Sequence, residues 1–561
     1  MNSRSIYLLI IPLVLSAFTH LWNPLGFPSF WYVEEIYLQR AMHVLHGLGN
    51  VDPLTTYGHP YDHPYFSQLI LAGLLKIINY PALLNLFVSM SSSYTLGDSS
   101  ADLSYSIDLL HLIPRLLIGT LAILDTFLIY KIAEHSYNSR TVAFIASLLF
   151  AVMPITWLTR KILLENLLLP LLLSSILFSI YYRKSSESTT THQINARAKQ
   201  LVLISISGIF LGLAIFTKLT AFTMIPLVGY LILSRVDKNF RHVMLWIIPV
   251  TMIPLVWPID AILNGELDLW LRDIIWQTQR QGASLLGSLT SFFQIDPVLV
   301  ILGITSLVYA EIKRDFLILL WAAPFLIFLF LVGFVSFFYL ILLIPLFCIA
   351  GGKFIEDLVN KINNRKRWQI IVSSIILSIA IFGMLNTILL ITIDVNSSYL
   401  QVYTFVTQHI IHDNNKYDNT SEQQINDQSS EKDYEYNDGR ITLIGNMWTR
   451  AYYWIPKYVF DKDVDIILLP TSRSSSPTIN TERILLKMDN HIQSLLSYNN
   501  SSNDTNQDGE YLNWIKTVNS STYKIAVFTE KSSIKDYKVY PYSGSMNHNV
   551  GISATEFRAN Y

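Results

Sequence analysis

Residues 200–217 read QLVLISISGIFLGLAIFT, and Lys218 follows directly. The stretch has no charged residue, and its length suits the roughly 17–25 apolar residues that a helix needs to cross a bilayer. Backbone polar groups must find partners within such a segment, which favours a helix. Ten further segments of this kind bring the prediction to eleven spans, the others being about 5–21, 109–131, 142–158, 163–182, 219–234, 243–262, 297–310, 316–333, 335–351 and 369–393.

The composition divides the chain into two parts. Of its 561 residues, 51% are hydrophobic and only 14% are charged, whereas soluble domains carry about 25% charged residues. The long apolar runs lie in residues 1–393, which we predict to be an α-helical polytopic membrane domain. Residues 394–561 are polar, and we predict a small α/β domain there, with strands near Ile441–Gly445, Val464–Leu469 and Lys524–Thr529, a helix near Thr481–Leu496, and disordered insertions near 413–438 and 498–508.

Charge and cysteine content exclude several classes of protein. The net charge of −1 favours neither a nucleic-acid binder nor an acidic interaction tail. The single cysteine, Cys348, lies in an apolar run, which excludes a disulfide framework or a thiolate metal site. Residues 1–21 lack an A-x-A-like cleavage site, so we expect a retained first helix rather than a signal peptide.

Lysine and arginine predict the orientation. With the N-terminus in the cytoplasm, the basic residues gather in the cytoplasmic loops, as the positive-inside rule requires. Eleven spans then leave residues 394–561 outside, which predicts a multi-pass plasma-membrane protein with an extracytoplasmic C-terminal domain. All N-x-[ST] sequons follow residue 393, which agrees with this orientation, although an Asn/Ser-rich tail also produces sequons by chance: Asn396, Asn419, Asn499, Asn500, Asn503 and Asn519.

The first outer loop, residues 22–108, is long for a connection, and such loops are usually functional. Its segments 34–47 and 65–80 are apolar enough for helices but too short to span. We therefore predict two helices that lie at the outer membrane surface or re-enter it.

Two polar clusters lie in this loop. Glu34 and Glu35 follow the first span, and they could stabilise a helix N-terminus or supply a general base for an acceptor hydroxyl. The run His59-Pro60-Tyr61-Asp62-His63-Pro64-Tyr65 offers Asp62 as a helix N-cap. Its His59, Asp62 and His63 could also bind a divalent metal, so a metal cofactor stays open.

A third cluster stands at the outer ends of later spans and comprises Arg115, Arg160-Lys161, Glu165 and Lys218. Ionisable groups beside membrane helices are costly and by default mark functional pathways. The cations could snorkel to the interface. They also suit a phosphate group, to which arginine offers a bidentate fork.

In combination these motifs resemble the glycosyltransferase C superfamily, and within it the protein O-mannosyltransferase and aminoarabinose transferase branch. That family has an Asp-Glu pair in its first outer loop, a D-x-HPP-like stretch, an Arg heading the next span, an Arg followed by an acidic residue, and a Gly-x-x-x-x-x-Lys. The matching residues here are Glu34-Glu35, Tyr61-Asp62-His63-Pro64, Arg115, Arg160…Glu165 and Gly212…Lys218.

The resemblance implies a polyprenyl(dolichyl)-phosphate sugar as donor and an inverting transfer to a protein, lipid or glycan acceptor. Glu34 takes the family's Asp position as base, with Glu35 beside it. Tyr65 replaces the second proline. Phosphate contacts would come from Arg115, Arg160, Lys218, Arg272 or Arg280. The last two lie in Trp270–Gly282, a lid over the donor or else an amphipathic helix at the interface.

Two other functions are compatible with the layout. An oligosaccharyltransferase of the same superfamily carries a Trp-Trp-Asp motif, but the run Asn446–Arg450 lacks the acidic residue. A secondary transporter usually has internal repeats and a midplane site, whereas this chain has no evident repeat and its polar clusters fall at one face.

Overall fold

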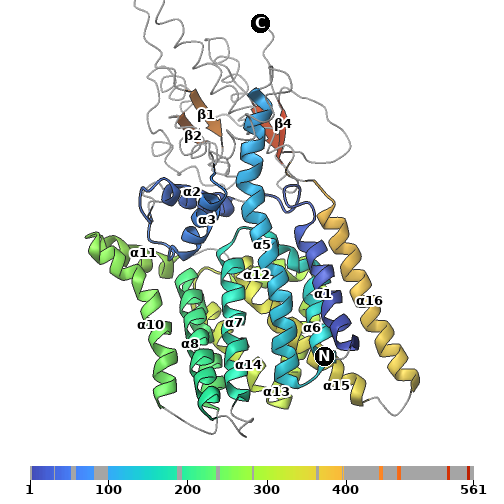
Figure 1. The fold of residues 1–561 in the computed structure, drawn as a ribbon. Coiled ribbons are helices and arrows are strands. Elements are labelled where there is room, and N and C mark those ends of the chain that lie inside the picture. The colour runs from blue at the N-terminus through green and yellow to red at the C-terminus, as the bar shows by residue number, and fades with distance from the viewer. Residues whose placement is uncertain are drawn as a thin grey trace, which may run out of the picture. The chain divides into compact units, whose positions relative to one another are not determined.

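The computed structural model describes most of the first 394 residues and four strands beyond them (Figure 1). The chain divides into two compact units. The first, called the membrane unit below, comprises Met1–Pro24, Ile36–Leu75 and Leu112–Ile393; the second comprises Leu25–Glu35, Lys76–His111 and Asp394–Tyr561. The described ranges are 3–30, 32–51, 59–80, 99–185, 193–234, 240–280, 284–361, 366–394, 396, 441–445, 464–468, 527–530 and 552–555.

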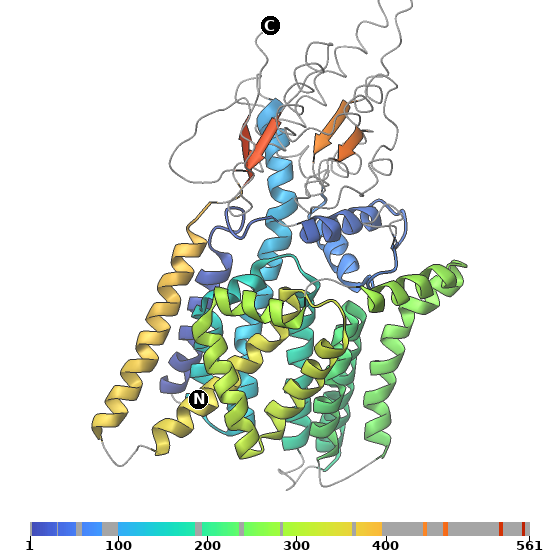
Figure 2. The ribbon, with the colours of Figure 1, turned by 180° about the vertical axis from the view of Figure 1, so that it is seen from behind.

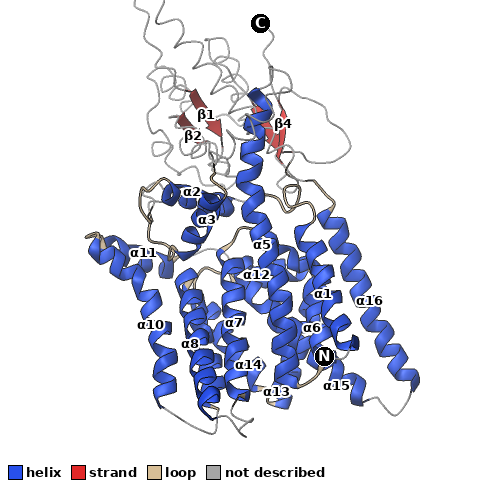
Figure 3. Cartoon of the chain, in the orientation of Figure 1, coloured by secondary structure: helices blue, strands red, loops and turns tan. Residues whose placement is uncertain are grey.

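Helices dominate the described residues (Figure 3). Helix α2 (Tyr32–Leu45) and helix α5 (Ser99–Tyr137) each begin in the second unit and end in the membrane unit. The other helices of the membrane unit are α1 (Ser3–Leu21), α3 (Phe66–Ile77), α6 (Arg140–Val152), η2 (Pro154–Arg160), α7 (Leu164–Lys184), α8 (Gln193–Thr217), η3 (Leu219–Met224), α9 (Ile225–Leu233), α10 (Phe240–Leu263), α11 (Leu267–Gln279), α12 (Leu285–Ile295), α13 (Pro297–Lys313), α14 (Phe316–Leu331), η4 (Phe337–Leu342), α15 (Leu343–Lys361) and α16 (Lys366–Ile391).

Every range predicted to span the membrane contains a helix. Within the described residues, five helical stretches are long and apolar enough to cross a bilayer: Asp108–Tyr137, Leu164–Lys184, Ala198–Thr217, Arg241–Leu263 and Phe337–Lys361. The pair α6 and η2 makes a sixth if its 71° bend is counted within one span. Several other apolar helices, α1 and α14 among them, are shorter. The structure thus supports a multi-span helical protein, while the count of eleven stays a prediction.

The bend between α6 and η2 has a local cause. Pro154 cannot continue the hydrogen-bond ladder of α6, and it disfavours helical backbone at Met153. The carbonyls freed at the break find side-chain donors, since Thr19 Oγ1 donates to Ala151 O at 2.9 Å and Thr387 Oγ1 donates to Val152 O at 2.8 Å. Hydroxyl groups on neighbouring helices therefore make a broken helix tolerable in apolar surroundings.

Small residues bring α8 and α10 into close contact. A Cβ atom on Gly208 would lie 2.5 Å from Trp246 O, and one on Gly212 would lie 2.4 Å from Pro249 O. The Gly208–Gly212 spacing is the GxxxG pattern that lets membrane helices approach at backbone distance. Gly212 of the predicted Gly…Lys motif is therefore a packing residue. Gly212 positions helix α8, and Lys218 follows the end of that helix.

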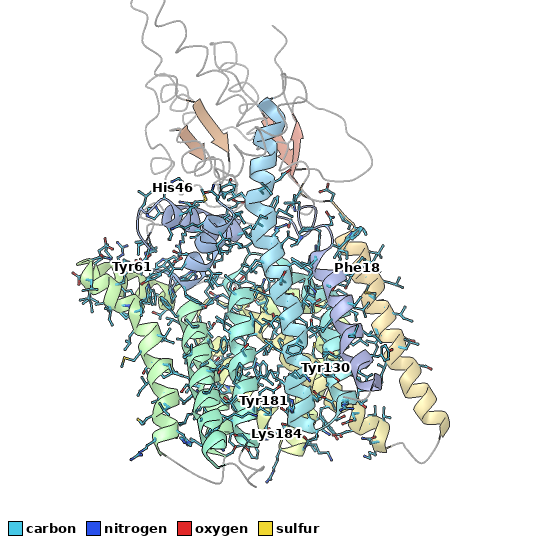
Figure 4. All side chains as sticks on the ribbon, viewed as in Figure 1. Phe18, His46, Tyr61, Tyr130, Tyr181 and Lys184 are labelled. Atoms are coloured by element: carbon cyan, nitrogen blue, oxygen red, sulfur yellow. The ribbon has the colours of Figure 1, made fainter. Side chains whose placement is uncertain are left out.

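The membrane unit has more than one layer of helices. Helices α7 and α8 lie on the side of the unit that faces the viewer in Figure 1. The yellow-green stretch that contains α12 and α13 lies on the opposite side, which faces the viewer in Figure 2. Figure 4 shows Tyr61 and His46 at the end of the unit where α3 and α11 lie, and Tyr181 and Lys184 at the opposite end. Lys184, predicted to be cytoplasmic, and Tyr61, predicted to be outside, thus lie at opposite ends of the helices.

Two helices form where the sequence predicts them in residues 22–108, while their place at the outer membrane surface stays a prediction. Helix α2 covers most of the predicted segment 34–47, and α3 covers most of 65–80. An aromatic cluster of Tyr61, Tyr65, Phe216 and Trp257 packs the loop before α3 against α8 and α10. This cluster anchors the His59–Tyr65 run within the membrane unit.

In the second unit, two short sheets are described. Strands β1 (Ile441–Gly445) and β2 (Val464–Leu468) pair in parallel, and β3 (Val527–Glu530) pairs antiparallel with β4 (Ile552–Thr555). The three predicted strands are thus found, the third shifted toward its C-terminal end. The predicted helix Thr481–Leu496 and the insertions 413–438 and 498–508 lie outside the described residues.

Asn396 is the one sequon residue among those described. Its side chain is 2% exposed, and its Nδ2 donates to Leu25 O at 2.6 Å and to Pro28 O at 2.8 Å. An amide nitrogen held in this way is a structural group rather than a glycan acceptor. The topological support from sequons therefore rests on the five that lie outside the described residues.

Candidate functional site

A buried ion pair joins α2 to the loop that precedes α3. Arg40 Nη1 lies 2.7 Å from Asp62 Oδ1, and the Arg40 side chain is 1% exposed. Burial by itself would raise the pKa of Asp62, but the neighbouring Arg40 guanidinium outweighs it, so the pKa lies below its ordinary value. Asp62 is thus a carboxylate at physiological pH, and the pair is fixed by charge.

His63 lies beside this pair and among further cations. Burial lowers its pKa to about 3; the Asp62 charge opposes that shift, and Lys218, Arg40 and Arg280 reinforce it. His63 is therefore a neutral imidazole at physiological pH, able to donate one hydrogen bond and accept another. Its electrostatic surroundings show that Asp62, Lys218, Arg40 and Arg280 lie around it.

A second buried ion pair is formed by Lys218 and Glu165. Lys218 Nζ donates to Glu165 Oε1, and both side chains are at most 5% exposed. Glu165 stands in the first turn of α7, and Lys218 lies at the junction of α8 and η3. The ammonium group also lies 3.8 Å from the centre of the Tyr339 ring, a cation–π distance. Lys218 is thus held by one carboxylate and one aromatic face.

Tyr37 connects the two ion pairs. Burial raises its pKa well above the ordinary value, and the charges of Glu165 and Asp62 raise it further, while Arg40 opposes them. The charges of Glu165 and Asp62 both act on the buried Tyr37 phenol, so this phenol lies near both carboxylates. The two pairs, Arg40–Asp62 and Lys218–Glu165, therefore belong to one site, called the paired-charge site below.

Arg280 ends α11 close to this site. Its guanidinium lies 4.7 Å from the Trp276 ring centre and 4.2 Å from the Phe334 ring centre. Stacking between two aromatic faces leaves the edge of a guanidinium available for hydrogen bonding, and Arg280 Nη1 already donates to Gln277 Oε1 at 3.3 Å. Since Arg280 acts electrostatically on both Asp62 and His63, it completes the cationic side of the paired-charge site.

Arg115 and Arg160 gather on a different feature, the turn that follows α1. Arg115 Nη1 donates to Pro24 O at 2.8 Å, and Arg160 Nη2 donates to Trp22 O and to Asn23 O. Helix C-termini leave carbonyls without helical donors, and arginines commonly satisfy them. The structure therefore gives both residues a role in fixing the end of α1. Lys161 beside them lies 5.3 Å from the Trp157 ring centre.

Glu34 and Glu35 belong to the second unit, at the first turn of α2. Both are buried, Glu34 completely. Glu35 Oε1 lies 2.8 Å from His111 Nε2, and the His111 ring centre lies 4.4 Å from that of Phe30, with the two rings tilted by 49°. Within the second unit, Glu35 thus has His111 as a partner.

The side chains His59 and Asp62 of the predicted metal site have other partners in the structure. His59 Nδ1 lies 2.8 Å from Asp273 Oδ1, and Asp62 is paired with Arg40. Within the part of the chain that is described, no group of three or more His, Cys, Asp or Glu side chains has the spacing to hold a metal ion.

The sequence reasoning missed three residues of this region. The sequence patterns do not single out Arg40, Asp273 or Tyr339. An arginine inside an amphipathic segment and an aspartate following Arg272 were available signals. Neither signal identifies the partner residue, because the pairs Arg40–Asp62 and His59–Asp273 join residues far apart in the chain.

With the geometry in place, the chain can be compared with known proteins. Residues 111–259 match the family model described as dolichyl-phosphate-mannose-protein mannosyltransferase. This match, over about a quarter of the chain, agrees with the predicted resemblance to the protein O-mannosyltransferase branch. The matched segment includes Arg115, Arg160, Glu165 and Lys218. Among curated proteins there is no match.

Several solved membrane enzymes are similar at low identity. ArnT from Cupriavidus metallidurans in the apo state is 13% identical over 82% of this chain and 85% of its own, with a TM-score of 0.49. The archaeal oligosaccharyltransferase AglB from Archaeoglobus fulgidus is 14% identical over 84% of this chain, with a TM-score of 0.48, and the chain spans only 65% of its length. The S. cerevisiae protein O-mannosyltransferase Pmt1-Pmt2 complex is 17% identical over 50% of this chain and 35% of its own, with a TM-score of 0.33.

Proposed function

We propose that this chain is a membrane glycosyltransferase that moves a monosaccharide from a polyprenyl-phosphate or dolichyl-phosphate donor to a protein, lipid or glycan hydroxyl. The observation that carries the proposal is the paired-charge site, where Lys218 and Arg280 stand beside buried carboxylates at one end of apolar helices. The match of residues 111–259 to a family named for a dolichyl-phosphate sugar supports the same donor class.

The site suits a donor with a charged head and an apolar tail. The tail of a lipid-linked sugar stays among or beside the helices, while its phosphate lies at the membrane surface. A lysine and an arginine there would stabilise the negative charge that the departing lipid phosphate acquires. Arg280 offers a planar fork for two phosphate oxygens, and Lys218 offers a point charge.

We further propose that a carboxylate of the Glu34–Glu35 pair acts as the general base. It takes the proton of the acceptor hydroxyl, whose oxygen attacks the anomeric carbon. The bond from that carbon to the phosphate oxygen breaks, and its electron pair leaves with the lipid phosphate. A single displacement inverts the anomeric centre. Glu34 is the first choice because it occupies the family's Asp position.

The orientation proposal follows from charge and from the ends of the helices. Tyr61 and Lys184 lie at opposite ends of the membrane unit (Figure 4). If the basic end that includes Lys184 is cytoplasmic, the paired-charge site faces the outside of the plasma membrane. A donor carried on a lipid and an acceptor outside the cell would meet there.

The test is sugar transfer by membranes that contain the full chain, with a panel of polyprenyl-phosphate sugars and with Glu34→Gln and Glu35→Gln variants. We expect transfer from one donor class and a loss of at least about 100-fold in Glu34→Gln. Equal transfer by the wild type and both variants would contradict the general-base assignment. Movement of a free solute without any transfer would favour a transporter, and transfer of a whole lipid-linked oligosaccharide to asparagine would favour an oligosaccharyltransferase.

A further inference from the structure

Helix α11 makes a series of polar contacts with the loop before α3. Asp273 Oδ2 accepts a hydrogen bond of 2.8 Å from the Tyr61 backbone N–H, and its Oδ1 accepts one from His59 Nδ1 at 2.8 Å. Gln277 Nε2 donates to Asp62 O at 3.1 Å. Glu266 Oε2, just before α11, accepts from Tyr61 Oη at 2.6 Å. Both elements lie in the membrane unit.

These contacts come from one face of the helix. Positions 266, 273 and 277 are separated by 7 and by 4 residues, so they project in similar directions from an α-helix. Asp273 is completely buried. Trp276 adds a stacked contact, with its ring centre 4.0 Å from that of His59. The inner face of α11 thus holds His59, Tyr61 and the backbone of Asp62.

The loop depends on these contacts. His59–Tyr65 contains no regular helix or strand, and within it the backbone closes only one long hydrogen bond, from Asp62 N to His59 O at 3.4 Å. Asp62 also carries the ion pair to Arg40. The position of Asp62 in the paired-charge site is therefore set by α11 on one side and by Arg40 on the other.

The outer face of α11 is apolar. Leu267, Leu271 and Ile275, here called the outer stripe, are 39–51% exposed and recur every four residues. The charged residues Asp268 and Arg272 lie beside this stripe. Large apolar side chains arranged in this way on a soluble surface would be costly, whereas a helix lying in a membrane interface combines an apolar face with a charged border.

The neighbouring helix indicates what covers the outer stripe. Only 17% of the apolar stretch of α10 is buried inside the protein, which leaves that span open to lipid. Its exposed side chains continue to the turn at Gly265, whose φ of +73° suits glycine, and α11 then turns away from the axis of α10 (Figure 1). The exposed large apolar residues near this end of α10 are Leu255, Val256, Ile259, Ile262 and Leu263. The stripe thus continues a lipid-facing surface.

We propose that α11 is a membrane-surface clamp: its outer stripe lies in the lipid interface, and Asp273 on the opposite face holds the His59–Asp62 segment in register with the paired-charge site. Asp273 is therefore a positioning residue, acting through His59 and Tyr61 rather than on substrate. The kinetic part of this inference rests on the proposed function, while the clamp and its lipid contact do not.

The lipid contact is tested on the full chain in vesicles of phosphatidylcholine and phosphatidylglycerol. Nitroxide labels are placed on Leu271→Cys, Ile275→Cys and Asp268→Cys, the native Cys348 being completely buried. We expect oxygen to collide with the first two labels more often than a water-soluble nickel chelate does, and the reverse at position 268. Equal exposure of all three positions to the chelate would overturn the lipid contact.

The clamp is tested by hydrogen exchange of the Tyr61 amide. Asp273→Asn should speed this exchange by about tenfold or more, because the charged acceptor of the Tyr61 N–H is lost. Asp268→Asn removes the same charge from the exposed side of the same helix and should leave the exchange rate unchanged. An unchanged Tyr61 rate in Asp273→Asn would overturn the clamp, whatever the enzyme transfers.

The positioning role is tested by steady-state transfer. Asp273→Asn should raise the KM for the polyprenyl-phosphate donor by about tenfold, with a smaller fall in kcat, and Asp268→Asn should match the wild type. His59→Asn keeps a donor toward Asp273 and should stay nearer the wild type than His59→Phe, which keeps only the ring against Trp276. Faster exchange with an unchanged KM would overturn the positioning role. Absence of transfer in the wild type would instead contradict the proposed function, and the two preceding measurements would still decide the clamp.

Discussion

The pair formed by Lys218 and Glu165 yields a quantitative prediction. Both side chains are at most 5% exposed, and Lys218 also lies 3.8 Å from the Tyr339 ring centre. Lys218→Met keeps the length of the side chain and removes its charge. Glu165 then remains as a buried carboxylate without its cation, which is far costlier than loss of a surface pair.

The magnitude follows from burial. Removing one partner of a buried ion pair costs about 3–5 kcal/mol, whereas an exposed pair contributes about 0–1 kcal/mol. The matched control is Lys353→Met on α15, because Lys353 pairs with Asp357 but is 29% exposed. Soluble domains of 150–250 residues lose about 2–4 °C in Tm per kcal/mol and larger ones lose less, so we expect a fall on the order of 5 °C for Lys218→Met and about 1 °C or less for Lys353→Met.

The chain supplies its own reporter for the assay. Cys348 is completely buried in α15, so a fluorogenic maleimide reacts with it only as the purified protein unfolds on heating. The double variant Lys218→Met/Glu165→Gln should recover most of the loss, since no buried charge is left unpaired. A Lys218→Met variant as stable as Lys353→Met would contradict the cost expected for an unpaired buried Glu165. So would a double variant whose loss equals the sum of the two single losses.

Three further predictions concern packing, pH and orientation. Gly212→Ala should lower the Tm by several degrees, since its Cβ would lie 2.4 Å from a carbonyl oxygen, while Gly73→Ala on α3 should not; equal Tm values would contradict the close helix contact. The pKa of His63 is about 3 in the folded protein and nearer 6.5 in the unfolded chain, so acidification from pH 7 to 4 favours unfolding. The His63→Gln variant should therefore lose less stability than the wild type over that range. An equal loss would contradict the burial of a neutral imidazole. An impermeant maleimide should label His46→Cys in intact cells and Lys184→Cys only after permeabilisation, and the opposite pattern would reverse the orientation.

The sequence predicts the helices of this fold better than their packing. Apolar runs locate the helices because backbone pairing in hydrocarbon leaves little choice. They do not reveal that Pro154 bends one predicted span by 71° or that several helices are short. Those features depend on which hydroxyl groups and glycines meet across helices, as Thr387 meets the carbonyl of Val152.

The candidate site can also be predicted only in part from the sequence, because its contacts depend on how the helices pack. Asp62, His63, Lys218 and Arg280 were singled out by their residue type and by their expected side of the membrane. Their partners could not be read from the sequence. For example, Glu165 and Lys218 are brought together only because α7 packs beside α8.

Arg115 and Arg160 show what the sequence pattern leaves out. The sequence singles them out as phosphate contacts, and the structure shows that they donate to carbonyls of the turn after α1. These carbonyl partners cannot be read from the sequence, because the pattern shows only two cations beside apolar segments. The contacts do not test the phosphate role, which stays a prediction.

Donor turnover by the purified protein shows whether the chain consumes a polyprenyl-phosphate sugar. The full chain is reconstituted in proteoliposomes with a donor labelled in both sugar and phosphate, together with an acceptor mixture from the native membrane. We predict release of polyprenyl phosphate in a 1:1 ratio with transferred sugar, and a loss of both in a Lys218→Met/Glu165→Gln variant that still folds. An intact donor in the presence of folded wild-type protein, across the full panel of sugars, would contradict the account.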